Sequence, residues 1–329
     1  LFSVGNVFFE IGDTVIEATD WGNDHYTAYW LPPAHGSYIL HIRATNNYGA
    51  NNTLSMPFNV VDQMDNTSVN AFSDVHVFVN DSEETVTATL PCYLGAFNQI
   101  VGNLTIGCEG GDCDPWDRVS SIEAKGHNGE WYEIIRYITP YGIACNSEID
   151  LTDFMSALQG KIDFRVTLVT FANGFLYSLD LDYTGGAPAY NYSSIQKLWN
   201  ATYDFGNPSN LQPTEALNPT YPENTIASRI KLVSSGHGWG DNNTDNAAEF
   251  SNNTHHIWVG GEQTFAQNNW ASCDPNPDGC NNQLGTWEFN RAGWCPGSIA
   301  PWFDFDLIDV VAGEQVELGY IFDQDYVDF

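Results

Sequence analysis

The tripeptide Trp116-Asp117-Arg118 places a carboxylate between an aromatic ring and a guanidinium group. An apolar neighbour raises a carboxyl pKa by desolvation, and a nearby cation lowers it. A carboxyl group under both influences can exchange protons near neutral pH, as a catalytic acid or base must. The alternative is a structural ion pair at the end of a strand, between Asp117 and a nearby arginine. The residues alone leave both interpretations open.

Side chains suited to binding a polar substrate stand farther along the chain. Arg291 can donate hydrogen bonds to a developing oxyanion or to a sugar oxygen. Alternatively, its guanidinium is structural and supports the loop that carries Trp294. The faces of Trp116, Trp239 and Trp294 suit stacking on sugar rings, although tryptophans are more often core residues. His237 is either a hydrogen-bonding group for a substrate or a structural turn residue.

Two segments contain the residue types of metal ligands. His255 and His256 are adjacent on a predicted strand, so their side chains point to opposite faces and we interpret them as structural. Asp274, Asn276 and Asp278 alternate as in the first half of a calcium loop, but glycine replaces the terminal glutamate. We therefore expect no metal and no other cofactor, with calcium at these three residues as the alternative to an Asx-rich turn.

The elements that position these residues read almost entirely as short strands. Runs such as 37–43, 75–79 and 164–169 are rich in β-branched and aromatic residues and are bounded by Gly, Asn, Asp and Pro. Residues 152–159 form the one predicted helix, which Gly160 ends. No alternation of strands and helices occurs, so the sequence predicts an all-β protein.

The chain divides into three blocks. Residues 1–62 resemble the bacterial immunoglobulin-like domains of secreted enzymes and adhesins, and residues 63–69 are polar and predict a linker. The remainder is too long for one small sandwich and fits two. We place their boundary so that residues 70–190 form the first and 191–329 the second.

A set of motifs in this remainder resembles the peptide-N-glycosidase F family. The resemblance runs from about residue 70 to residue 329 and rests on several motifs that occur in family order. They are Cys108–Arg118, Gly129–Ile134, Arg136–Tyr141, Ser235–Gly240, Ala248–Glu249 with Thr254–His255, and Arg291–Gly297.

The resemblance implies two eight-stranded antiparallel jelly rolls packed side by side, with a site in the cleft between them. It also implies an amidase that cleaves the bond between the asparagine side chain of a glycoprotein and its first N-acetylglucosamine. Asp117 matches the principal catalytic acid of the family. Glu249 matches a second carboxylate that orders water, or it is an exposed turn residue. Trp116, Arg118, His237, Trp239, Arg291 and Trp294 then become candidate substrate-binding residues.

This sequence departs from the family at several positions. A third acidic residue and a tryptophan, in a Thr-Glu-Thr-Trp element of the family, fall on Leu168 and Thr170 when counted back from Gly174. Two cysteines that flank the second carboxylate become Ala247 and Ser251, so the loop of Glu249 lacks a covalent brace. Reduced, altered or lost activity follows as an expectation.

The cysteines predict a set of disulfides. Cys108–Cys113 closes a small loop, and Cys273–Cys295 anchors the loop of Trp294, with Cys280 as an alternative partner. Cys92 and Cys145 form a third candidate pair, and seven cysteines leave one thiol over.

Composition and sequons indicate the compartment. Ten basic against 42 acidic residues, a net charge of −32, repel phosphate backbones, and no apolar run is long enough to span a bilayer. We therefore expect no nucleic acid and no membrane insertion. The eight Asn-x-Ser/Thr sequons exceed the roughly four that chance predicts and, with the cysteines, favour an extracellular or cell-surface glycoprotein. They begin at Asn51, Asn66, Asn80, Asn103, Asn191, Asn200, Asn242 and Asn252.

Two functions compete on this basis. The first is a secreted amidase acting on N-glycoproteins. The second is a non-catalytic surface or filament-forming glycoprotein that uses the paired jelly rolls to contact carbohydrate or protein. Strands expected before Leu1 and after Phe329 are missing from this sequence, which favours either a fragment of a longer chain or self-assembly by strand exchange.

Overall fold

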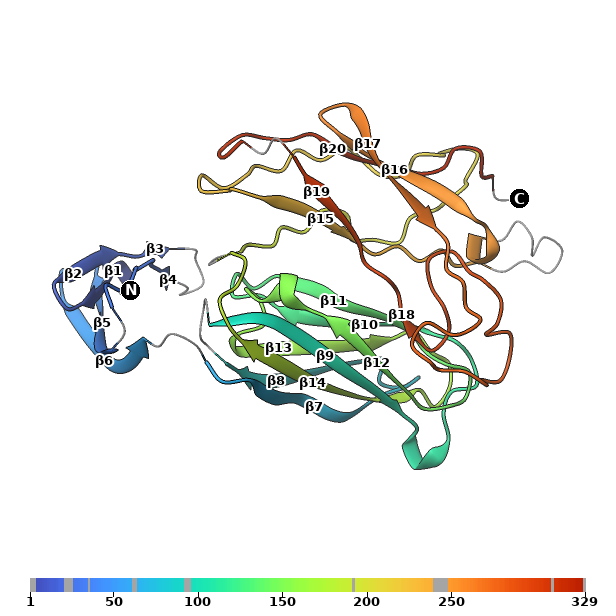
Figure 1. The fold of residues 1–329 in the computed structure, drawn as a ribbon, viewed down its shortest axis with the longest axis horizontal. Helices are drawn as coiled ribbons and strands as arrows, with labels where there is room; N and C mark the ends of the chain where they lie inside the picture. The colour runs from blue at the N-terminus through green and yellow to red at the C-terminus, as the bar shows by residue number, and fades with distance from the viewer. Residues whose placement is uncertain are drawn as a thin grey trace.

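The computed structural model describes residues 4–20, 26–34, 36–60, 64–91, 96–190, 193–238, 248–308 and 311–327. These residues form antiparallel strands and short 3-10 turns, as the sequence predicts (Figure 1). None of their helices is long and apolar enough to cross a membrane.

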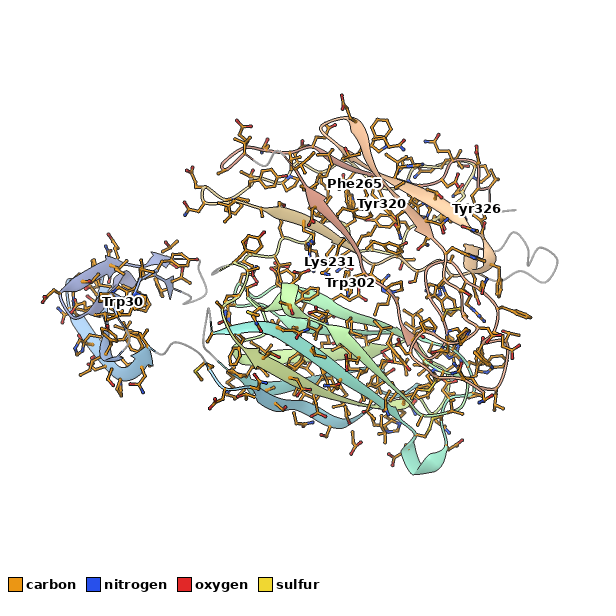
Figure 2. All side chains as sticks on the ribbon, viewed as in Figure 1. Trp30, Lys231, Phe265, Trp302, Tyr320 and Tyr326 are labelled. Atoms are coloured by element: carbon orange, nitrogen blue, oxygen red, sulfur yellow. A yellow bond between two sulfur atoms is a disulfide. The ribbon has the colours of Figure 1, made fainter. Side chains whose placement is uncertain are left out.

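The strands of the N-terminal unit make one sheet and one small pair. They are β1 (Val4–Ile11), β2 (Thr14–Glu17), β3 (Thr19–Asp20), β4 (Tyr26–Thr27), β5 (Gly36–Asn46) and β6 (Asn51–Val60). The sheet order is β2-β1-β5-β6, and β3 pairs with β4. Tyr38 on β5 lies opposite Phe58 on β6, and Trp30 packs edge-on against both rings (Figure 2). The immunoglobulin-like assignment of this unit stays a prediction.

A sandwich of two sheets forms the centre of the molecule. Its strands are β7 (Thr67–Val77), β8 (Glu83–Leu90), β9 (Phe97–Gly107), β10 (Val119–Lys125), β11 (Trp131–Ile138), β12 (Cys145–Asp150), β13 (Gly160–Leu168) and β14 (Phe175–Gly185). One sheet has the order β12-β9-β14-β7. The other has the order β18-β11-β10-β13-β8, in which β18 is Ser298–Ile299. Every second residue of β14 is buried, as a strand covered on one face requires.

A second, smaller sandwich follows. It contains β15 (Ser228–Leu232), β16 (Asn253–Val259), β17 (Glu262–Asn269), β19 (Phe303–Leu307) and β20 (Leu318–Ile321) in sheets β15-β19 and β17-β16-β20. Long irregular segments connect these five strands, where the sequence predicts eight. Its core includes Ile230, Ile257 and Tyr320. His255 is buried in this core while His256 faces the other way, as their alternation predicts.

The two sandwiches are joined by more than a linker. The short strand β18 (Ser298–Ile299) belongs to the C-terminal half of the chain, yet it pairs with β11 of the first sandwich. Lys231 of β15 binds Asp153 at 3.1 Å and covers the ring of Trp302, which packs against Phe154 of the first sandwich (Figure 2). The predicted boundary at residue 190 therefore separates the main bodies but not every strand.

Two local expectations differ from the structure. The predicted helix over 152–159 is only a single 3-10 turn, η2 (Thr152–Phe154), and Gly160, with a φ of +68°, then turns the chain into β13. The predicted linker 63–69 ends earlier, since Thr67, Ser68 and Val69 already pair with β14.

The disulfides correct one predicted pairing. Cys108–Cys113 and Cys273–Cys295 are present. Cys145 pairs with Cys280 and not with Cys92, which lies outside the described residues. The physical reason is topological: β12 is the edge strand of its sheet and begins at Cys145, next to the loop that contains Cys280. This bond thereby fastens the two halves of the chain together.

The sequons differ in accessibility. Asn103 is half-buried on β9, where its amide donates to Asp182 at 2.8 Å. Asn51, Asn66, Asn80, Asn200 and Asn252 are exposed, and Asn191 and Asn242 lie outside the described residues. Their glycosylation stays a prediction.

Gly174 provides a test of the packing between β14 and β7. It has a φ of +68°, and a Cβ atom there would lie 1.8 Å from the carbonyl oxygen of Val77. We expect Gly174→Ala to lower the free energy of unfolding by about 3 kcal/mol or more through this clash. Gly129→Ala is the control because Gly129 also has a positive φ but open space around it, so about 1–2 kcal/mol is expected. Equal losses in urea denaturation would contradict the described packing.

Candidate active site

A buried guanidinium group lies at the centre of the site. Arg291 is fully buried, and its donors are all directed at protein acceptors. Nε donates to Glu249 at 3.0 Å, and Nη1 donates to the carbonyl of Phe289 at 2.6 Å. Nη2 donates to Thr286 and, at 3.3 Å, to the Tyr141 hydroxyl. A planar guanidinium with fixed donors also fixes the positions of the acceptors that surround it.

The two predicted catalytic carboxylates meet at this arginine. Asp117 comes just before β10, and its Oδ2 lies 3.9 Å from Arg291 Nη2. Glu249 comes from η4 (Ala248–Phe250) in the C-terminal half of the chain. The side chains of Asp117 and Glu249 are 18% and 15% exposed, so both acids are mostly buried but still reach solvent. The structure therefore brings together the pair that the sequence proposes.

Both carboxyl groups have pKa values above their ordinary range. Desolvation by burial is the main cause for each, and the charge of Arg291 opposes it. The charge of Asp117 also raises the pKa of Glu249, as expected for two acids that share one cation. A raised pKa brings a carboxylate closer to the neutral range in which general acids and bases are most effective.

Tyr141 is a site residue that the sequence reasoning missed. Its hydroxyl hydrogen-bonds to Asp117 and accepts from Arg291, and burial together with the Asp117 charge raises the pKa of Tyr141 to about 12. The phenol is therefore protonated at neutral pH and acts as a donor to the carboxylate. The Ile-Thr-Pro-Tyr turn that supported the resemblance contains this tyrosine and was the available signal.

Arg118 does not pair with Asp117, which corrects the simplest interpretation of the Trp-Asp-Arg tripeptide. Its Nε donates to Asp114 at 3.2 Å, and its guanidinium lies over the ring of Phe171. The carboxylate of Asp114 is completely buried, so it needs a cation more than Asp117 does, whose side chain still reaches solvent. Arg118 itself stays partly exposed and stays a candidate for substrate binding.

Two predicted substrate-binding residues are covered by protein. Trp294 is only 2% exposed: one side of its ring faces Arg291 at 5.0 Å, and His237 stacks on it at 4.9 Å. It has no free face for a sugar, and its Nε1 donates to Gly236 at 2.7 Å. Arg291 is likewise out of reach of a ligand, because its donors are used internally.

The other predicted binding residues have different outcomes. Trp116 is exposed beside Asp117 and can offer its face to a sugar. His237 is exposed next to Trp294, and its Nε2 lies 3.0 Å from the Ser235 hydroxyl. Trp239 lies outside the described residues. Their roles in binding stay predictions.

The loop of Glu249 is braced without the cysteines of the family. The Ala292 amide donates to the carbonyl of Glu249 at 2.9 Å, and the Gly236 amide donates to that of Ala292. Gly236 permits this approach, since a Cβ atom there would lie 2.8 Å from that of Ala292. Backbone hydrogen bonds thus connect Glu249 to the segment that carries Arg291. Ala247 lies outside the described residues.

The structure also corrects the position of the missing third acid. Leu168 is 1% exposed and packs in the core of the first sandwich, so the family's acidic side chain has no place there. Val169 is 66% exposed, and Phe171 is also exposed. Because side chains alternate along a strand, the exposed positions of this segment are 169 and 171, and they hold valine and phenylalanine.

The calcium candidate has the structure of an Asx turn. Asn276 is buried, and its Oδ1 accepts from the amides of Asp278 and Cys280 and from the Ser298 hydroxyl. Asp278 accepts from the Ile299 amide at 2.9 Å. These hydrogen bonds are those of the Asx-rich turn, and Asp274 is exposed. Among the described residues no cluster of acidic, histidine or cysteine side chains could hold a metal ion.

The fold and site together define a class: two packed antiparallel sandwiches that contribute one carboxylate each to a buried arginine. Comparison with known proteins points to peptide-N-glycosidase F and its relatives. Residues 209–322 match the family model for the C-terminal part of peptide-N-glycosidase F. A region of 233 residues is 35% identical to peptide-N(4)-(N-acetyl-β-D-glucosaminyl)asparagine amidase F from Elizabethkingia miricola, covering 65% of each chain.

Solved structures agree with this assignment. PNGase F, a glycosylasparaginase from Flavobacterium meningosepticum, superposes with a TM-score of 0.68 at 29% identity over 79% of this chain and 89% of that one. The structure of PNGF-II shares the fold over 94% of this chain and 85% of that one, with a TM-score of 0.62 at 13% identity. The chain is therefore similar in sequence and in fold to members of the peptide-N-glycosidase F family.

Removal of the Asp117 charge should alter how stability depends on pH. Because the folded-state pKa of Asp117 is raised, the native protein binds its proton more readily than the unfolded chain does. Stability is therefore lost as pH rises from the ordinary carboxyl range through the raised pKa. We expect Asp117→Asn to remove this loss, so that the variant gains on wild type over that window and keeps the difference at higher pH. Urea denaturation at a series of pH values measures it, and a difference of the opposite sign refutes the assignment.

Loss of the Arg291 guanidinium should strongly lower the stability of the fold. We expect Arg291→Met to lower the free energy of unfolding by about 3–5 kcal/mol, because it leaves two buried carboxylates without their cation. Arg229→Met is the matched control, since Arg229 makes its ion pairs at the surface and should matter by about 1 kcal/mol or less. Comparable denaturation midpoints for the two variants would contradict a central role for Arg291.

Proposed function

We propose that this protein is an amidase that hydrolyses the bond between the asparagine side chain and the first N-acetylglucosamine of N-glycoproteins. The observation that carries the proposal is the convergence of Asp117 and Glu249, from opposite halves of the chain, on Arg291. Similarity to this family supports the same reaction, since the relatives bear the names of an amidase and a glycosylasparaginase. The matched region spans 65% of the curated relative.

The geometry assigns a role to each group in this reaction. Asp117 takes a proton from a water molecule that attacks the side-chain amide carbon, and Glu249 orders that water. The carbon–nitrogen bond then breaks, the nitrogen leaves with the sugar as a glycosylamine, and the proton passes from Asp117 to that nitrogen. The peptide retains aspartate in place of asparagine. Tyr141 and Arg291 hold the Asp117 carboxylate in place while its charge changes.

No metal or organic cofactor is part of this proposal. Carboxylates, a phenol and a guanidinium supply the proton transfer and the charge that amide hydrolysis needs. We further propose that the protein works outside the cell or at its surface, which is supported by three disulfides among the described residues.

A direct assay tests the reaction. Incubation of a denatured N-glycopeptide with the protein in the presence of EDTA should release the glycan and convert asparagine to aspartate. In water labelled with oxygen-18 the new carboxyl group should contain one heavy oxygen. Asp117→Asn should lower kcat/KM at least about 1000-fold, because the acid and base functions vanish together. The variant Asp182→Asn, which changes a carboxylate on the far sheet, should keep wild-type activity.

A second candidate is a glycan-binding protein without catalysis, and the segment 168–171 favours it because it contains no acidic side chain where the resemblance expects a third acid. Wild type would then leave the glycopeptide intact while still binding the free glycan in calorimetry. Restoration by Val169→Glu, at an exposed position of this segment, of a reaction that wild type lacks would identify the missing acid as the cause.

A further inference from the structure

Another carboxylate, that of Asp114, lies three residues before Asp117 in the same loop. Asp114 is completely buried, and its Oδ1 accepts from the Trp116 amide at 3.0 Å. Its Oδ2 accepts from Arg118 Nε at 3.2 Å and from the Thr170 hydroxyl. These two donors belong to different segments, since Thr170 follows β13 while Arg118 leads into β10.

The backbone of Asp114 makes further connections. Its amide donates to the Gly174 carbonyl at 3.2 Å, and its carbonyl accepts from the Gly142 amide at 3.0 Å. Gly142 directly follows Tyr141, the donor to Asp117. Asp114 therefore ties the loop that carries Asp117 to the loop of Tyr141 and to the β13–β14 hairpin.

The residues on either side of Asp117 are both held by this one carboxylate. The Trp116 amide is fixed on one side, and the Arg118 guanidinium is drawn away on the other. Arg118 would otherwise be the nearest cation along the chain to Asp117. In the structure, Asp117 instead hydrogen-bonds to Tyr141, and its Oδ2 lies 3.9 Å from Arg291 Nη2.

We propose that Asp114 is a positioning residue of the active site: by holding Arg118 and the Trp116 backbone, it keeps Asp117 facing Arg291 and Tyr141 and free of an ion pair with Arg118. The inference deepens the proposed amidase function and rests on it for its kinetic consequence. Its structural part, the separation of Arg118 from Asp117, does not depend on catalysis.

The charges that face the two acids agree with this role. Asp117 is faced by Arg291, Arg118, Tyr141 and Glu249, and the Arg118 charge lowers the pKa of Asp117 less than Tyr141 and Arg291 do. Asp114 is faced by Arg118, Thr170 and, more distantly, Tyr177, whose pKa is raised mainly by burial and also by the Asp114 charge. Loss of the Asp114 charge would free Arg118 to pair with Asp117.

The test is the variant Asp114→Asn, with Asp182→Asn as a control that also changes a hydrogen-bonded carboxylate. We expect the acid limb of the kcat/KM profile to move down by about one pH unit in Asp114→Asn, because Arg118 then stabilises ionised Asp117. We expect kcat to fall roughly 10-fold or more with a smaller change in KM, because the base is weaker and misdirected. Asp182→Asn should change neither.

Combination with Arg118→Met separates positioning from simple destabilisation. The acid limb of Asp114→Asn/Arg118→Met should return to that of Arg118→Met alone, because no cation is left to capture Asp117. A persistent shift in the double variant, or no shift in Asp114→Asn, overturns the proposal.

The carboxyl pKa of Asp117, measured by carbon-13 NMR, gives a readout without catalysis. It should fall in Asp114→Asn even if wild type proves inactive on every glycopeptide, so failure of the amidase proposal is distinguishable from failure of this one. If Asp114→Asn does not fold, the variant Arg118→Met in an otherwise wild-type chain tests the proposal in its place. It should change the Asp117 pKa by less than about half a unit, since Arg118 is already engaged elsewhere. A rise of a full unit or more overturns the proposal.

Discussion

The site depends on one buried cation. A guanidinium removed from water is costly unless its donors are satisfied, and Arg291 satisfies them with Glu249, Tyr141, Thr286 and a carbonyl. The same bonds decide where the two acids lie. Because each acid comes from a different half of the chain, the arginine is also the point at which the halves are held in register.

The surroundings of this cation determine its electrostatic effect. Aromatic rings cover it, with Trp294 at 5.0 Å and Phe250 at 5.3 Å from its central carbon. These rings exclude water and lower the local dielectric, which strengthens every charge interaction beneath them. The result is a pair of carboxylates that are held by a cation and yet have raised pKa values, since desolvation outweighs attraction.

The sequence predicts the all-β class, since alternation of apolar residues in runs such as 164–169 depends only on local chemistry. The convergence of Asp117 and Glu249 follows from family resemblance, as no local pattern connects two distant acids. The pairing of Arg118 with Asp114 escapes prediction, because it depends on which neighbour is nearest in space. The Cys145–Cys280 bond escapes for the same reason, whereas burial of Trp294 is one of the two interpretations that its residue type leaves open.

Strand β18 has a consequence for how the molecule is made. The outer edge of β11 is completed by Ser298 and Ile299, which lie some 160 residues farther along the chain than Ile138. During synthesis, that edge stays unpaired until Ser298 and Ile299 have left the ribosome. The first sandwich can collapse early, but this sheet closes late, so a nascent chain that stalls between residues 190 and 298 presents an open edge to its neighbours.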